Sequence, residues 1–400
     1  MKARTVLISG AGIAGPTLAF WLNAAGFEPT LIEHAPAVRT GGYVIDLWGL
    51  GYDIAECMGL LSEIDRAGYR IQEMRIVDGR GERIAGFGTR ALNDLTGGRV
   101  VTLARSNLSH LLFERIKDMT EAIFGDEIVT LEDDGEGVEV QFRRRGARRF
   151  DLVIGADGLH SMVRGLAFGA QDRFEVGLGY LVAAFEVPGY RPRDEQAYII
   201  FNEPGRMLGR FALHGDRTLF LFVFTAGEGS RPPDLPGQKA LVRARYAEGQ
   251  WECPRILDEL DRVEDLYFDR VSQIRMNAWS KGRVALVGDA AFCVSLMAGQ
   301  GSALAMTAAY VLAGELAKAR GRQDEAFGAY EALLRGFIAS KQRGAARFST
   351  TFVPKTRAGL FLRNQVIKAC TIPGVAKFAF GREITDTLRL PQYSWLVPSA

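Results

Sequence analysis

The stretch Gly10-Ala11-Gly12-Ile13-Ala14-Gly15 lies between an apolar run over residues 4–9 and a periodic segment over residues 14–25. The apolar run predicts a buried parallel strand, and the periodic segment predicts a helix that ends at Gly26. In this setting the three glycines allow a tight turn, close approach of a pyrophosphate, and packing of the helix on the strand. The helix N-terminus adds about 0.3–1 kcal/mol of attraction for an anion. The stretch therefore predicts a dinucleotide site.

A second predicted strand, over residues 29–33, ends in Glu33. This is the spacing at which an acidic residue accepts hydrogen bonds from the ribose hydroxyls of a bound dinucleotide. The alternative is a glycine-rich turn without a ligand. The position of the glycines between strand and helix, with the acidic residue in place, favours the dinucleotide.

Composition sets broad limits on the class of protein. The chain has 400 residues, enough for two domains, and its 49 basic and 47 acidic residues give a net charge of +2. This balance gives no electrostatic reason to expect binding to nucleic acid or to a membrane. Four scattered cysteines without a CxxC pair argue against a metal site or disulfides and favour a cytoplasmic location. Residues 290–314 carry no charge, and their glycines predict a buried loop and helix rather than a membrane span.

The pattern along the chain predicts an α/β fold in two domains. Residues 127–133 and 137–143 flank Asp134-Gly135-Glu136, which predicts a hairpin. Strand-like runs over 179–187, 197–202, 207–213, 218–225 and 267–276, with few helical signals, predict a mainly antiparallel sheet. The βαβ pattern returns at residues 283–287, so this sheet is inserted into the Rossmann-like domain. We expect the nucleotide-binding domain over residues 1–70, 98–171 and 279–345, the sheet domain over 71–97 and 172–278, and a helical C-terminal tail over 346–400.

Two further segments give the dinucleotide site its identity. Gly155-Ala156-Asp157-Gly158-Leu159-His160-Ser161-Met162-Val163-Arg164 follows a predicted buried strand, and Gly288-Asp289-Ala290-Ala291 follows another, with Gly299-Gln300-Gly301 downstream. They resemble the "DG" and "GD" motifs of the group A FAD-dependent monooxygenases, the family of para-hydroxybenzoate hydroxylase and the tetracycline-inactivating hydroxylases. The resemblance covers residues 1–345 and is strongest in these motifs.

The resemblance implies a GR2-type FAD-binding domain, an inserted sheet that binds the substrate, and non-covalent FAD. NAD(P)H would bind transiently in a groove, because the chain has no second complete GxGxxG motif. The implied reaction uses NAD(P)H and O2 to hydroxylate an aromatic or polycyclic small molecule through a flavin C4a-hydroperoxide. We expect a monomer or homodimer.

The resemblance also assigns roles to residues. Asp289 would accept a hydrogen bond from the ribityl chain, Gly299 and Gly301 would approach the flavin ring, and Asp157 would link the cofactor to the nicotinamide side. Arg39 and Arg105 would contact the flavin or its pyrophosphate. The expected cofactor-binding residues are Gly10, Gly12, Ile13, Ala14, Gly15, Glu33, His34, Arg39, Arg105, Asp157, Gly158, Arg164, Gly288, Asp289, Gly299, Gln300, Gly301 and Ser302.

Two positions depart from the family pattern. Phe292 stands where the family usually has a histidine, and Ser295-Leu296 stands where it has a proline beside the flavin. The loss of the rigid proline affects the expected shape of the face where oxygen reacts, and it leaves flavin binding intact.

Substrate contacts are less well marked in the sequence. Phe220, Phe222 and Phe224 alternate with period two and share one face of a strand, and Phe211 can join them. They form either an apolar wall for a flat substrate or the core of the sheet. Tyr43 and Asp46, in the loop near the expected flavin edge, are candidate contacts to substrate or flavin, and the pattern singles out no acid–base residue.

Two other functions stay open at this stage. The first is a flavin oxidoreductase, such as a double-bond reductase, that inserts no oxygen. The second is a flavin-binding protein without turnover. Oxygen isotope transfer separates the first from a monooxygenase, and substrate-stimulated oxidation of NAD(P)H separates the second from both enzymes.

Overall fold

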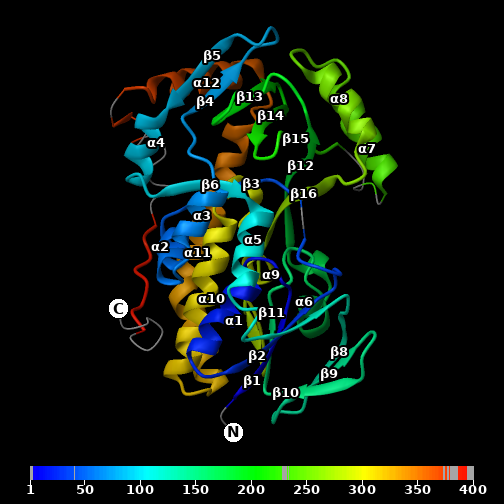
Figure 1. Cartoon of the computed structure of the whole chain (residues 1–400), viewed down its shortest axis with the longest axis vertical. Coiled ribbons are helices and arrows are strands. Elements are labelled where there is room, and N and C mark those ends of the chain that lie inside the picture. The colour runs from blue at the N-terminus through cyan, green and yellow to red at the C-terminus, as the bar shows by residue number, and fades with distance from the viewer. Residues whose placement is uncertain are drawn as a thin grey trace.

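The computed structural model describes residues 3–39, 41–227, 232, 234–372, 374–375, 378 and 386–393. Two sheets organise this part of the chain, one below the other in Figure 1, with the long helices α10 and α11 alongside the lower one. The predicted α/β class is confirmed. The boundaries of the two domains remain a prediction.

The lower sheet has the strand order β17-β18-β11-β1-β2-β7, and its strands pair in parallel except at β17. β1 and β11 are nearly continuous apolar runs, and β2 is buried from its second residue to its last, because both faces of this parallel sheet are covered. The strands are β1 (Thr5–Ser9), β2 (Glu28–Glu33), β7 (Glu121–Phe124), β11 (Leu152–Gly155), β17 (Ser280–Lys281) and β18 (Val284–Leu286). Their order places the carboxyl ends of β1, β2 and β11 together, as the glycine turn requires.

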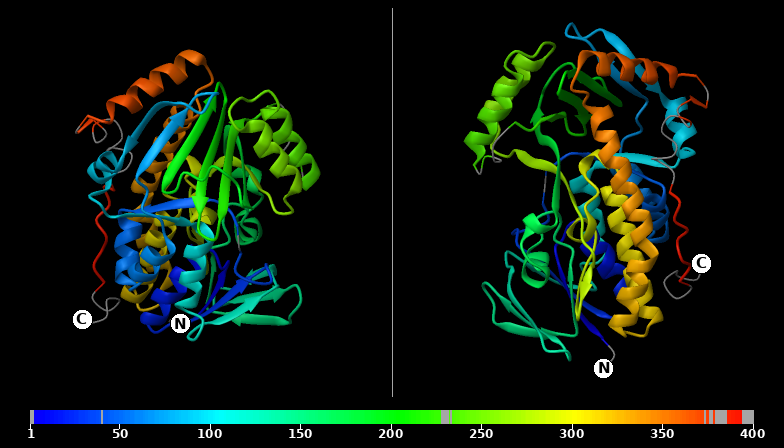
Figure 2. Two further views of the ribbon diagram at one scale, coloured as in Figure 1. Left: turned by 45° about the horizontal axis from the view of Figure 1, so that its top comes forward. Right: turned by 180° about the vertical axis from the view of Figure 1, so that it is seen from behind.

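Helices and small sheets surround this parallel sheet. α1 and α10 pack against each other, and α11 runs alongside them toward the upper sheet in the view from behind (Figure 2). The helices are α1 (Ala14–Ala24), α2 (Leu50–Cys57), α3 (Leu61–Ala67), α5 (Arg105–Glu114), α6 (Met162–Phe168), α9 (Asp289–Phe292), α10 (Gly301–Lys318) and α11 (Gln323–Phe352), with 3-10 turns at Gln171–Arg173 and Leu296–Ala298. The predicted hairpin forms part of the three-stranded sheet β8 (Ile128–Asp133), β9 (Val138–Phe142) and β10 (Ala147–Phe150), and β3 (Val44–Trp48) pairs with β6 (Val100–Ala104).

The upper sheet has the order β16-β12-β15-β14-β13-β4-β5 and is antiparallel except between β13 and β4. One face packs on α7 and α8, two helices for which the sequence pattern gave no prediction. The strands are β4 (Glu73–Val77), β5 (Arg83–Gly88), β12 (Glu175–Pro188), β13 (Ala197–Glu203), β14 (Arg206–Leu213), β15 (Arg217–Thr225) and β16 (Tyr267–Ile274), and the helices beside them are α4 (Thr89–Thr96), α7 (Leu235–Tyr246), α8 (Cys253–Arg262) and α12 (Arg357–Ala369).

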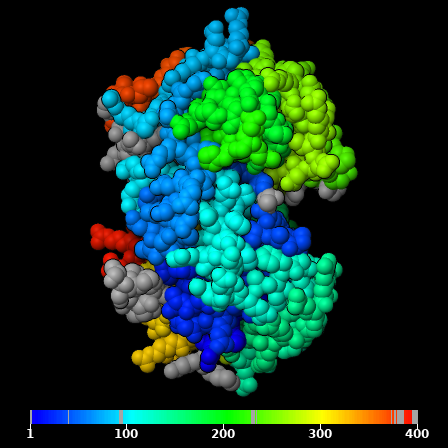
Figure 3. All heavy atoms as spheres, in the orientation of Figure 1, coloured from blue at the N-terminus to red at the C-terminus, as the bar shows by residue number. Residues whose placement is uncertain are grey.

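The other face of the upper sheet turns toward the lower sheet. The space-filling view shows the surface hollowed on one side, between the part that carries α7 and α8 and the part that carries β8–β10 (Figure 3). Within the described residues, no helix is both long and apolar enough to cross a membrane.

Candidate functional site: a dinucleotide cavity between the two sheets

A cavity of about 1930 Å³ lies between the sheets and brings the predicted segments together. Most of the residues predicted to bind the cofactor line it: Gly10, Gly12, Ile13, Ala14, Glu33, His34, Arg39, Arg105, Asp157, Gly158, Asp289, Gly299, Gln300, Gly301 and Ser302. Single ligands usually occupy pockets of about 300–1,000 Å³. The cavity therefore has room for a dinucleotide and a second molecule.

The glycine turn has the geometry that its sequence predicts. Gly10 has φ of +110°, and a Cβ there would lie 2.6 Å from the carbonyl oxygen of Ala156. A Cβ at Gly15, which lies outside the cavity wall, would lie 1.9 Å from the oxygen of Gly10, so the helix could not pack. At Gly12 the nearest atom to a Cβ would be Arg105 Nη2, at 3.6 Å. Gly10 and Gly15 thus shape the backbone, whereas Gly12 leaves space toward the cavity.

The N-terminus of α1 is open to a ligand. No side chain caps it, and no acidic residue lies in its first turn. Its first N–H groups therefore lack the partners that helices usually find in an N-cap side chain. Together with the positive end of the helix dipole, these groups make the start of α1 suited to an anion.

Glu33 is held at the end of β2 by backbone hydrogen bonds. The N–H of Ala11 donates to Oε2, and the N–H of Ala35 donates to Oε1, both at 2.9 Å. The carboxylate is buried, and His34 Nδ1 lies 3.0 Å from Oε1. Arg39 contacts His34 and lies on the exposed side of this group. Glu33 is therefore fixed beside the glycine turn, where a ribose would lie.

Arg105 and Asp289 both line the cavity and interact electrostatically. Arg105 begins α5 directly after β6, and within the described residues it forms no ion pair. Burial raises the pKa of the Asp289 carboxyl, and the positive charge of Arg105 acts against this rise. A Cβ at Gly301 would lie 3.9 Å from Asp289 Oδ1, which shows how closely the start of α10 approaches this carboxyl. Gly288, just before Asp289, has φ of +65° and lies behind the cavity wall.

Asp157 fixes the loop after β11. Its Oδ2 accepts hydrogen bonds from the N–H groups of Met162 (2.9 Å) and Val163 (3.1 Å), and Ser161 donates to its Oδ1 at 2.5 Å. Burial raises the pKa of this carboxyl, and these donors act against the rise. Asp157 therefore caps the start of α6 and holds Gly158 at the cavity.

Arg164 lies outside the cavity wall, unlike the other charged residues in the predicted set. Its side chain is fully buried and donates to the oxygen of Ala290 (2.9 Å), the oxygen of Leu159 (2.6 Å) and Oε1 of Gln171 (3.1 Å). It thus joins the segment around Asp157 to the one around Asp289. Arg164 braces the two motifs from behind and is not part of the cavity wall.

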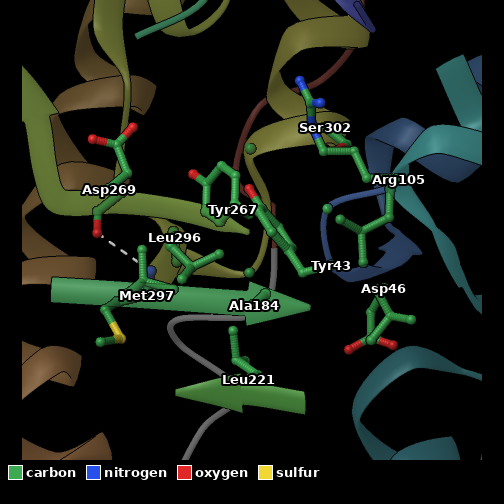
Figure 4. A pocket seen from close by; sticks show the side chains of 18 of the residues that line it. Tyr43, Asp46, Arg105, Ala184, Leu221, Tyr267, Asp269, Leu296, Met297 and Ser302 are labelled. Atoms are coloured by element: carbon green, nitrogen blue, oxygen red, sulfur yellow. Dashed lines mark hydrogen bonds between the residues drawn. The ribbon is translucent and has the colours of Figure 1, made fainter. Parts of the chain in front are cut away.

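Tyr43 and Asp46 line the cavity, as expected of substrate or flavin contacts. Figure 4 shows Tyr43 beside Tyr267, and their ring centres are 5.4 Å apart. Burial raises the pKa of Tyr43 to about 12. Asp46 Oδ1 accepts hydrogen bonds from Thr102 and, at 3.1 Å, from the hydroxyl of Tyr198. Burial raises the pKa of Asp46, and both donors act against the rise.

The four phenylalanines divide between the two faces of the upper sheet. Phe211 lines the cavity, where its ring lies 4.8 Å from that of Tyr198. Phe220, Phe222 and Phe224 are buried on the opposite face, against α7 and α8. The three do share a face, but it is the core of the sheet and not the cavity wall. The residues of β15 that line the cavity are Arg217, Leu219, Leu221 and Val223.

Several cavity residues had no signal in the sequence. Tyr198 and Tyr267 lie in ordinary strand patterns, and Asp269 reaches the wall from β16, where His160 Nε2 lies 2.9 Å from its Oδ2. Arg363 reaches the wall from α12 in the tail. Only the pairing of strands far apart in sequence brings these side chains together. His160 was visible within the second motif, but its partner was not.

Comparisons with known proteins agree with this geometry. The model of the FAD binding domain family matches residues 3–335. A flavin-dependent monooxygenase from an unidentified prokaryotic organism is 33% identical over 397 residues, which cover 97% of this chain and 98% of that one. A flavin-dependent monooxygenase of Legionella longbeachae serogroup 1 (strain NSW150) is 32% identical over 404 residues, with 97% and 98% covered.

Solved structures show the same fold. Tetracycline destructase Tet(55) superposes with a TM-score of 0.84 at 29% identity, covering 98% of this chain and 99% of that one. Klebsiella pneumoniae HpxO, complexed with FAD and uric acid, superposes with a TM-score of 0.77 at 23% identity, covering 95% and 96%. The chain therefore belongs to the FAD binding domain family and is an FAD-dependent monooxygenase.

Proposed function

We propose that this monooxygenase uses NAD(P)H and O2 to hydroxylate an aromatic or polycyclic small molecule. The observation that supports this most is the continuity of the cavity, which reaches from Gly12 and Glu33 to the aromatic side chains of Tyr43, Tyr198 and Phe211. A dinucleotide held at one end leaves its reactive ring near the other, beside a second ligand.

The residues present fit FAD. Gly12 leaves room for a pyrophosphate, the uncapped N-terminus of α1 provides N–H donors, and Arg105 supplies a positive charge that no carboxylate of the described chain pairs. Glu33 is placed to accept from the ribose, and Asp289 from the ribityl chain. FAD, when bound, supplies the electron transfer and the oxygen chemistry, and the protein supplies position and surroundings.

The cavity wall near Tyr43 and Tyr267 is suited to a flat substrate. Ala184, Leu221 and Met297 give it an apolar surface, and Figure 4 shows them below Tyr43 and Tyr267. Such a wall excludes water from the reacting atoms. Two similar solved structures support the proposed substrate class, because Tet(51) and Tet(55), at 29% identity, are destructases of tetracycline, a polycyclic molecule.

Asp46 would orient a hydroxyl group of this substrate. Its two hydrogen bonds within the described part of the chain end on Oδ1, so Oδ2 is placed to accept from a ligand in the cavity. A carboxyl whose pKa is raised by burial is a stronger base than an ordinary aspartate. A phenol held by Asp46 would carry more electron density on its ring, which favours attack by an electrophilic oxygen.

The deciding experiment follows the oxygen atom. Purified enzyme with FAD is given NADPH or NADH, ¹⁸O2 and a panel of phenolic and polycyclic compounds, and the products are analysed by mass spectrometry. We expect one ¹⁸O atom in the product of each compound that stimulates oxidation of NAD(P)H. Products without label would contradict the proposal, and a product with a reduced double bond would identify a reductase instead.

A further inference from the structure

Arg363 is a buried cation at the end of the cavity formed by α12, β4 and β13. Arg363 is only 8% exposed, and it lines the cavity. It donates to Asn202 Oδ1 at 2.7 Å, to the carbonyl oxygen of Phe352 at 3.1 Å, and to Asn364 Oδ1 at 2.8 Å. All three acceptors are neutral.

No carboxylate of the described residues compensates the charge of Arg363. It forms no ion pair among them, and burial alone lowers its pKa, to about 10. At neutral pH the guanidinium therefore keeps its proton. A buried cation without an anionic partner is costly, so proteins usually pair such groups or place them where a ligand pairs them.

The neighbouring amide adds to this imbalance. Because Arg363 donates to Asn202 Oδ1, the Nδ2 group of Asn202 must point away, and it is buried without an acceptor among the residues that the structure describes. This corner of the structure therefore holds more hydrogen-bond donors than acceptors. On the side of α11, Arg343 and Arg347 add two more positive charges to the cavity wall.

The surroundings of Arg363 are otherwise apolar. Met74, Ile76, Ile200 and Ile367 line the same end of the cavity. A single ligand that fills this end of the cavity would therefore combine a charged group with an apolar body.

We infer that Arg363 pairs with a carboxylate group of the substrate, so that the enzyme takes aromatic or polycyclic acids. The inference rests on the proposed function, since it assigns the substrate class of that same cavity. Arg363 would determine specificity by pairing with a group that does not react.

A purely structural role for Arg363, as a brace between elements, would explain fewer of these observations than a carboxylate ligand does. The contacts with Phe352 and Asn202 do join α12 to the end of α11 and to β13. These acceptors are uncharged, however, so they require hydrogen-bond donors and give no reason for a permanent charge beside the cavity. A brace also predicts no preference between an acid and its amide.

The test uses matched probes on FAD-loaded enzyme. Binding of 2-naphthoate, 2-naphthamide, anthracene-2-carboxylate and anthracene-2-carboxamide is measured by perturbation of the flavin absorption spectrum. We expect each acid to bind at least tenfold more tightly than its amide. Equal affinities in the wild-type enzyme, or no binding of either acid, would overturn the inference.

Three variants locate the effect. Arg363→Gln should weaken binding of the acids at least tenfold and change binding of the amides less than twofold, and Arg363→Lys should retain part of the preference. Arg357→Gln is the matched control, because Arg357 lies on the same helix, exposed and outside the cavity wall. An equal loss for acids and amides in Arg363→Gln would identify a brace and overturn the inference.

The flavin spectrum also separates the two proposals. Protein that takes up no FAD, or product without ¹⁸O, contradicts the proposed function. Enzyme that binds FAD and incorporates ¹⁸O, but shows no preference for acids, contradicts only the assignment of Arg363.

Discussion

Lys341 and Asp386 form an ion pair in which Nζ lies 2.8 Å from Oδ1, and the exposed fractions of the two side chains are 9% and 10%. The second oxygen of Asp386 accepts the N–H of Leu50 at 3.0 Å, at the start of α2. Lys341 belongs to α11 and lines the cavity. One carboxylate from the end of the chain therefore joins the cavity wall to an N-terminal helix.

Asp386→Ala should destabilise the protein. It leaves a buried lysine without this partner and removes an acceptor at the start of α2, and breaking a buried pair in this way costs about 3 kcal/mol. The measurement is the free energy of unfolding in urea. Glu325→Ala is the control, because it breaks the ion pair of Glu325 with Arg322, in which both side chains are more than half exposed. We expect this variant to lose less than about 1 kcal/mol of unfolding free energy. Equal losses of unfolding free energy in the two variants would show that the buried pair of Lys341 and Asp386 stabilises the protein no more than an exposed pair does.

Gly12→Ala should give a folded protein that binds FAD poorly. A Cβ at Gly12 meets its nearest atom, Arg105 Nη2, at the ordinary distance of 3.6 Å, but it occupies the space left for a pyrophosphate. We expect the far-ultraviolet circular dichroism of the wild type and at least a tenfold loss of FAD affinity, measured by equilibrium dialysis.

Gly15→Ala provides the contrast within the same turn. Its Cβ would lie 1.9 Å from the oxygen of Gly10, so strand and helix must move apart and the protein should be recovered in low yield or unfolded. Wild-type FAD affinity in Gly12→Ala would place the pyrophosphate elsewhere, even if Gly15→Ala fails to fold.

These two glycines illustrate what the sequence could predict. The glycine turn, β1, β2 and the hairpin of β8 and β9 depend on local signals, namely glycines, apolar runs and a turn of Asp134-Gly135-Glu136, and all were predicted correctly. The three motifs also met at one cavity, because the carboxyl ends of neighbouring parallel strands lie at one edge of a sheet.

The upper sheet shows where local signals fail. Period two in β15 places Phe220, Phe222 and Phe224 on one face, but Leu221 and Val223 make the other face apolar as well. No local feature of the sequence indicates which face of β15 packs against α7 and α8 and which face lines the cavity. Those two helices follow the strands in sequence, and in α8 the spacing of Ile256, Leu257 and Leu260 was a helical signal that the prediction did not use.

Loss of FAD at acid pH should report on Asp289. Burial raises the pKa of this carboxyl, and hydrogen bonds from FAD hydroxyls favour its charged form. FAD affinity should therefore be full above the raised pKa and fall as the pH falls through it, at a higher pH than an ordinary aspartate would give. Titrations of the enzyme with FAD at several pH values, from about pH 8 to about pH 4, measure this fall in affinity, which we call the acid limb.

Two variants fix the assignment to Asp289. Arg105→Gln removes a positive charge that lowers the pKa of Asp289, so the acid limb should move to higher pH, whatever the change in overall affinity. Asp289→Asn cannot titrate and should bind FAD weakly, without this limb. An unchanged limb in Asp289→Asn would assign the titration to another group.

Asp46 should control a second acid limb, which appears in the pH dependence of kcat/KM and not in that of FAD binding. If its carboxylate orients a substrate hydroxyl, then kcat/KM falls as the pH falls through its pKa, which burial raises. Tyr198→Phe removes a donor that lowers this pKa, so the limb should move to higher pH, while the ring keeps its packing 4.8 Å from Phe211. Asp46→Asn should abolish the limb and lower kcat/KM by about 10²-fold or more, with FAD occupancy unchanged. The measurement is the pH profile of substrate-stimulated oxidation of NAD(P)H, and a wild-type profile in Asp46→Asn would remove Asp46 from the reaction.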